Sequence, residues 1–145
     1  MRIYLPATLD ELDGALRPRR AHAVTSALRA ELPDEDDEGL EFAAQLAAAA
    51  GSLELIAASP DAPRLRLVVS ADVPDAAVTV AEGAEPSAVD VGLVAPDAIA
   101  CVHVDEPQAR PDVERAIAGD ADAAERLEEA DLLWYDVSEL RAIPR

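Results

Sequence analysis

Cys101, His103 and Asp105 are the residues whose types and spacing most resemble a chemical site. If this segment is a β-strand, the alternation of side chains places the thiol, the imidazole and the carboxylate on one face. Such groups can ligate zinc, but a zinc site normally takes four ligands from more than one segment. No second group of Cys or His residues completes the set, although Glu106 or Asp136 could contribute. An enzyme or metal-binding protein centred on this strand is therefore the alternative interpretation, and no catalytic residue, metal ligand or cofactor is predicted.

A second candidate site consists of arginine and aromatic residues that we expect on one face of a sheet. An arginine side chain pairs bidentately with phosphate or carboxylate, and a neighbouring aromatic ring can stack on a flat ligand. The same arginines could instead pair with the protein's own carboxylates. The candidate ligand-binding residues are Arg2, Tyr4, Arg66, His103 and Tyr135, with Arg64 beside Arg66 and with Trp134 as the alternative to Tyr135.

The charge of the chain limits the classes of partner. It has 12 basic residues, all of them arginine, against 30 acidic ones, and a formal net charge of −18. A surface of this sign repels DNA, RNA and anionic membranes, so no nucleic-acid or membrane partner is predicted. The single cysteine, Cys101, cannot form an intramolecular disulfide, and the start of the chain lacks the apolar segment of a signal peptide. A cytoplasmic location is therefore expected.

The elements that must position these residues are predicted to form one α+β domain over residues 1–145. Strands are predicted at 3–5, 65–71, 89–94, 99–104 and 132–135, with 78–80 as a further candidate strand, and helices at 8–16, 26–32, 35–58, 111–119 and 120–129. Residues 17–20, which include Pro18, are predicted to break the chain in a solvated turn. We summarise the order as β-α-α-β-β-β-α-β. It favours a single-layer, mostly antiparallel sheet with helices on one face, closest to a ferredoxin-like plan.

Residues 35–58 carry the strongest helical pattern of the chain. Apolar residues recur at spacings of four and three, at Phe42, Leu46, Ala49, Leu53 and Ile56. This spacing draws one apolar stripe along a helix. We predict that the stripe packs on the sheet over residues 40–57, with Leu46 and Leu53 as core residues.

Five stretches of the sequence together resemble a small actinobacterial family known only as a domain of unknown function. The stretches are MRIYLPAT at 1–8, AVT at 23–25 leading to ALR at 27–29, LEFAA at 40–44, VHVD at 102–105 and DLLWYDV at 131–137. They span nearly the whole chain, and none is a chemical motif by itself. The family usually has a proline where Ser26 stands and an aromatic residue where His22 stands. The resemblance implies an actinobacterial cytoplasmic protein and implies no activity.

The leading interpretation is a small cytoplasmic binding or interaction module without catalysis of its own. Its predicted partner is a small anionic molecule or an acidic segment of an unknown protein, bound on the arginine and aromatic face. A homodimer is also considered, because a half-covered sheet leaves apolar and edge groups that need cover.

Overall fold

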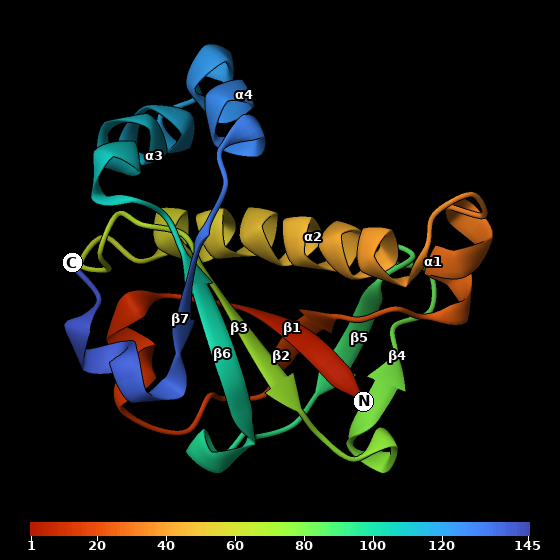
Figure 1. Cartoon of the computed structure of the whole chain (residues 1–145). Helices are drawn as coiled ribbons and strands as arrows, with labels where there is room; N and C mark the ends of the chain where they lie inside the picture. Colours follow the sequence, from red (N-terminus) through yellow and green to blue (C-terminus); the bar gives the residue numbers. More distant parts are fainter.

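The computed structural model describes all 145 residues and contains one seven-stranded sheet, in which all neighbouring strands are antiparallel (Figure 1). The strand order is β4-β5-β2-β1-β3-β6-β7. The strands are β1 (Arg2–Ala7), β2 (Arg19–His22), β3 (Leu67–Asp72), β4 (Val78–Val80), β5 (Ala88–Val91), β6 (Ile99–Val104) and β7 (Leu133–Asp136). The α-helices are α1 (Ser26–Glu31), α2 (Asp37–Ala58), α3 (Arg110–Ile117) and α4 (Ala121–Glu129). Short 3₁₀ helices are η1 (Leu9–Asp13), η2 (Asp75–Ala77), η3 (Pro96–Ala98), η4 (Pro107–Ala109) and η5 (Val137–Ala142).

The α+β class is confirmed, whereas the ferredoxin-like strand order is not. The difference arises mainly from β2, which lies between β1 and β5 and occupies part of the segment predicted to be a turn. Arg20 of β2 pairs with Asp90 of β5 at 2.8 Å, and Ala21 and His22 are buried. A four-residue strand with a single apolar residue carries almost no period-two signal, so the sequence pattern does not reveal it.

The larger hydrophobic core lies on the face of the sheet opposite α2. It contains 18 buried residues, among them Ile3, Leu5 and Val69 of the central strands. No α-helix contributes to this cluster. Instead, it includes Leu9 of η1 and Ile143, which follows η5. Both faces of the central sheet are therefore covered, and the second face is not the open surface that a single-layer sheet would leave.

Helix α2 lies across the other face of the sheet (Figure 1). The predicted helix is confirmed, and the second half of its predicted stripe is buried, since Ala49 and Ile56 are buried and Leu53 packs on a buried cluster. The first half of the stripe does not face the sheet. Phe42 and Leu46 are exposed, whereas Ala44 and Ala48 are fully buried. The reason is close approach, because a Cβ atom placed on Gly51 would lie only 3.0 Å from the Cβ atom of Pro6. Near Gly51, only small side chains fit between the helix and the sheet.

A buried serine fixes α2 to the sheet. The hydroxyl of Ser52 donates a hydrogen bond to the carbonyl oxygen of Ala7 at 2.7 Å and accepts one from the N–H of Leu67 at 2.9 Å. These two backbone groups belong to the end of β1 and the start of β3. By length and composition alone α2 could cross a membrane, a criterion that the core helix of a globular domain also meets.

Helices α3 and α4 form a hairpin beyond the C-terminal end of α2 (Figure 1). A small cluster of Ile56, Val113 and Leu127 joins the hairpin to α2. The chain then returns through residues 130–132 to β7, which is the outer strand next to β6. This return forms one wall of the groove described next.

Candidate functional site

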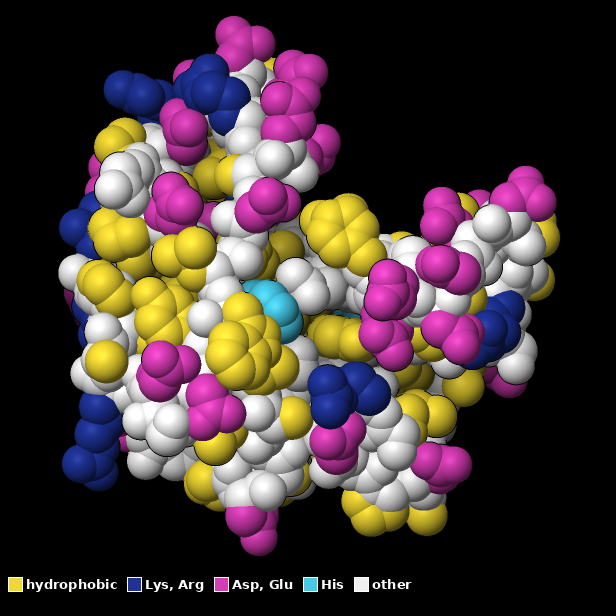
Figure 2. All heavy atoms as spheres, viewed as in Figure 1, with side chains coloured by type: hydrophobic (Ala, Val, Ile, Leu, Met, Phe, Trp, Pro, Cys, Tyr) yellow, Lys and Arg dark blue, Asp and Glu magenta, His cyan; other side chains and the backbone are white.

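A groove of about 320 Å³ lies between α2 and the β6–β7 side of the sheet. We call it the α2–β7 groove. It is lined by Phe42, Gln45, Leu46 and Ala49 of α2, by His103 and Trp134 of β6 and β7, by Arg66, and by residues 128–132. Figure 2 shows a histidine at the bottom of a hollow between hydrophobic side chains.

The walls of the groove hold the largest apolar side chains that the fold leaves exposed. Phe42 is 53% exposed, Leu46 41% and Trp134 58%. The chain contains only one Phe and one Trp, so both residues are placed here rather than in a core. Their exposure is the main signal of the site, and the sequence pattern misassigned Phe42 and Leu46 to the core.

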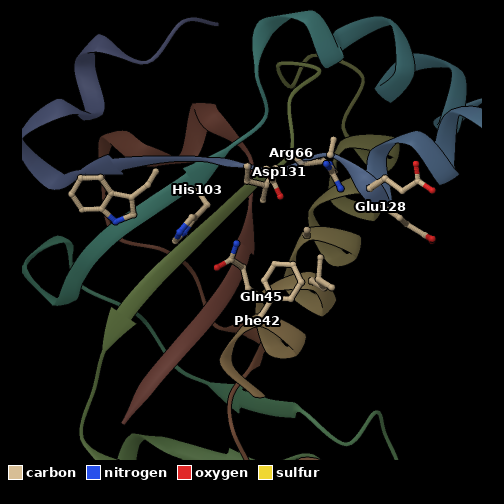
Figure 3. A pocket seen from close by; sticks show the side chains of 12 residues that line it. Phe42, Gln45, Arg66, His103, Glu128 and Asp131 are labelled. Atoms are coloured by element: carbon tan, nitrogen blue, oxygen red, sulfur yellow. The ribbon is translucent and has the colours of Figure 1, made fainter. Parts of the chain in front are cut away.

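His103 presents one ring nitrogen to the groove and buries the other. Its Nδ1 atom is buried and has no hydrogen-bond partner, whereas its Nε2 atom is not buried in this way. Burial lowers the pKa of His103 below its ordinary value of 6.5. A buried Nδ1 without an acceptor favours the neutral ring with its proton on Nε2. The groove thus offers a hydrogen-bond donor, and the amide of Gln45 extends toward the same ring from α2 (Figure 3).

Arg66 is not available to an anionic ligand. Its guanidinium pairs bidentately with Asp105, with distances of 3.0 Å from Nε to Oδ2 and 2.8 Å from Nη2 to Oδ1. Nη2 also donates to the carbonyl oxygen of Leu127 at the end of α4. Both charged side chains are more than nine-tenths buried. Arg66 is therefore a positioning residue that holds the groove wall of residues 128–132 against the sheet.

Arg2 and Tyr4 lie on the same face as His103, as the strand registers require, but neither lines the groove. Arg2 pairs with Asp72 at 2.7 and 3.0 Å, and these bonds raise the pKa of Arg2 and lower that of Asp72. Tyr4 is buried beneath α2 beside Val68. Burial, with the charge of Glu41, raises the pKa of the Tyr4 hydroxyl.

Tyr135 does not share the face of the other candidate residues. It packs against the larger core on the opposite side of the sheet. Trp134, the alternative residue, pairs with His103 across β6 and β7 and lines the groove. Neighbouring residues of a strand point to opposite faces, so only one of the two aromatic residues can lie beside His103.

The Cys101, His103 and Asp105 set shares a face but does not form a working cluster. Cys101 is buried, and the carboxylate of Asp105 is occupied by Arg66. No group of three His, Cys, Asp or Glu side chains is arranged to hold a metal ion.

The rim of the groove is negatively charged. Glu128, Glu129 and Asp131 line it, and none of these carboxylates has an ion-pair partner. The one basic side chain in the lining, Arg66, is neutralised by Asp105. The groove therefore combines an apolar interior with an acidic rim, and this combination favours a ligand that is apolar and cationic.

Comparisons with known proteins identify a family. Residues 1–143 match the model of DUF6912, a family of unknown function. Neither the search of curated proteins nor the search of solved structures returned a match.

Proposed function

We propose that this chain, which belongs to the DUF6912 family of unknown function, is a binding module whose partner enters the α2–β7 groove. The partner is a protein segment that carries one apolar side chain flanked by arginine or lysine. The observation that carries this proposal is the exposure of Phe42, Leu46 and Trp134 around a single groove.

Apolar anchors of this kind provide most of the binding energy in protein interfaces. Large exposed apolar residues in one patch mark interaction sites, and tryptophan is enriched among the residues that contribute most. The groove volume of about 320 Å³ suits one large side chain rather than an extended ligand. The Nε2–H of His103 and the amide of Gln45 supply hydrogen bonds inside it.

Charge selects the sign of the flanking residues. The three rim carboxylates are unpaired, and the whole chain carries a net charge of −18. Basic side chains beside the apolar anchor would meet complementary charge, which speeds association and rejects acidic competitors. Because Arg2 and Arg66 each pair with a carboxylate of the protein's own, the geometry favours a basic segment over the anionic ligand expected from the sequence.

Trp134 allows a direct test because it is the only tryptophan in the chain. The pentapeptide acetyl-Arg-Thr-Leu-Thr-Arg-amide, which contains no fluorophore, should shift the Trp134 emission to shorter wavelength as the indole ring becomes covered. The same peptide with Glu in place of Arg should bind more weakly. Leu46→Ala should weaken binding of the basic peptide about tenfold through the loss of an anchor contact.

Leu93→Ala is the matched control, because Leu93 is 67% exposed and lies outside the groove. It should leave the affinity for the basic peptide unchanged. Equal effects of the two substitutions would contradict a site in the groove. Tighter binding of the acidic peptide would favour the anionic ligand, and an emission shift that depends on protein concentration alone would indicate a homodimer.

We also propose a cytoplasmic location, on the ground given by the sequence. Cys101 is the only cysteine, and it is buried and unpaired. A protein without disulfides suits a reducing compartment.

A further inference from the structure

The outer strand of the sheet beside the α2–β7 groove has free backbone groups. β7 pairs with β6 alone, and it lies at one end of the strand order. An edge strand of this kind presents N–H and C=O groups that another extended chain can pair with.

The direction of these groups follows from one hydrogen bond and the register of the strands. The N–H of Asp105 donates to the carbonyl oxygen of Arg66 at 3.1 Å, on the β3 side of β6. Backbone groups alternate in direction along a strand, so the N–H and C=O of His103 also point to β3. His103 pairs with Trp134 in the β6–β7 register. The N–H and C=O of Trp134 must therefore point away from β6.

The end of β7 agrees with this assignment. Asp136 lies two residues after Trp134, so its N–H also points away from β6, and it donates to the carboxylate of Glu139 at 2.9 Å. The Glu139 side chain thereby occupies the next outward-pointing N–H group of β7 after that of Trp134. No hydrogen bond is formed by the outward N–H and C=O of Trp134 within the chain.

The other edge of the sheet differs. β4 has only three residues, and the N–H of Val78 is already bonded to the carbonyl oxygen of Asp75. No residue of β4 lines the α2–β7 groove. The open backbone groups of β7, in contrast, belong to Trp134, whose side chain forms part of a groove wall.

We propose that the basic partner segment binds as an eighth strand along the outer edge of β7. This inference rests on the proposed function of the α2–β7 groove. The residue opposite Trp134 would exchange two hydrogen bonds with it and direct an apolar side chain to the α2 face. The residues two positions away would share that face, where basic side chains meet Asp131 at one end of β7 and Asp136 at the other.

Hydrogen exchange of two neighbouring amides tests the proposal. When acetyl-Arg-Thr-Leu-Thr-Arg-amide saturates the wild-type protein, exchange of the Trp134 N–H should slow at least about tenfold as it becomes hydrogen-bonded. The Tyr135 N–H is the internal control, since it points to β6 and should show little change. Methylation of alternate peptide nitrogens should abolish binding, while methylation of the intervening ones should be tolerated.

The outcomes separate the two proposals. If the peptide shifts Trp134 emission in a manner sensitive to Leu46→Ala but leaves Trp134 N–H exchange unchanged, strand addition is overturned and the groove proposal stands. If all N-methylated peptides bind equally, strand addition is likewise overturned. If the peptide does not bind at all, both proposals fail.

Discussion

Two clefts flank α2 on the same face of the sheet, and each contains a histidine. The α2–β7 groove contains His103. A cleft of about 410 Å³ on the other side contains His22, together with Arg20, Glu54 and Glu85. Burial lowers the pKa of both histidines. Residue type and burial therefore do not distinguish the two sides.

The two clefts differ in how the fold satisfies their polar groups. His22 Nδ1 lies 2.8 Å from the hydroxyl of Ser87, and the charge of Glu85 partly offsets the effect of burial on its pKa. The α2 wall of this cleft contains small residues such as Ala47 and Ala50. His103 has no such partner, and its cleft is walled by large apolar side chains. The α2–β7 groove thus differs from the other cleft in the histidine nitrogen that the fold leaves unsatisfied and in the apolar side chains that it leaves uncovered.

The largest effect should come from breaking the ion pair that holds the wall of the α2–β7 groove. Arg66→Met should lower the free energy of unfolding by about 3–5 kcal/mol, because it leaves the Asp105 carboxylate buried and unpaired. Arg2→Met breaks the exposed pair with Asp72 and should cost only about 0–1 kcal/mol. Urea denaturation of both variants gives the comparison. A loss near zero for Arg66→Met would show that water reaches Asp105, whereas Arg66→Met with Asp105→Leu should recover much of the stability.

The orientation of α2 gives the next largest effect. Leu40→Ala should cost about 2–5 kcal/mol, because Leu40 of α2 is buried in a cluster with Tyr4 and Val68 of the sheet and its truncation leaves a cavity. Leu46→Ala should change stability by only about 0.5 kcal/mol, since the side chain faces the groove. Denaturation midpoints measure both. If Leu46→Ala cost as much as Leu40→Ala, the apolar stripe predicted from the sequence would be the buried one after all.

Two buried serines allow a satisfied hydroxyl to be compared with an unsatisfied one. Ser87→Ala removes the partner of His22 and should cost about 1 kcal/mol. Ser70→Ala removes a buried hydroxyl that has no partner, so its cost should be about zero, or the variant should be slightly more stable. Thermal and denaturant unfolding distinguish the two. A loss of similar size for Ser70→Ala would mean that its hydroxyl is bonded in solution.

The smallest effect concerns pH. Because the pKa of each histidine is lower in the folded state than its ordinary value of 6.5, the unfolded chain binds protons more readily below that pH. Each histidine therefore destabilises the fold as the pH falls below 6.5 and has no such effect above it. His103→Gln should remove this contribution, so the stability of wild type relative to the variant should decrease from pH 7.5 to 5.5. A constant difference over this range, or an NMR pKa of His103 above 6.5, would contradict the assignment.

Local signals in the sequence predicted much of the secondary structure. Thr25 accepts a hydrogen bond from the N–H of Leu28 and caps α1, and Asp120 caps α4 in the same way. Cap residues act within one turn of helix, so their effect is visible in a short stretch of sequence. The signal for β6 is also local, because the alternation of its side chains, which places Cys101 and His103 on one face, is visible in a short stretch of sequence.

The candidate site was predicted only in part. His103 lines the groove and Trp134 was recognised as an alternative, but Arg2 and Arg66 pair with carboxylates of the same chain, Arg2 at the surface and Arg66 in the interior. With 30 carboxylates available, the sequence cannot identify which of them pairs with a given arginine. Asp105 pairs with Arg66 because the β3–β6 register brings them together, and that register is a long-range property.

The amino-acid sequence alone determined the α+β class, the acidity of the surface and the positions of most helices and strands, because these depend on composition and on neighbours a few residues apart. Packing determined which side of α2 meets the sheet and therefore where the groove lies. An apolar side chain contributes the same pattern to the sequence whether it faces a core or an open groove, because the spacing reports which residues share a face of the helix and not what covers that face. Phe42 and Leu46 could be assigned to the groove only once Pro6 and Gly51 were seen to bring the helix too close to the sheet for large side chains.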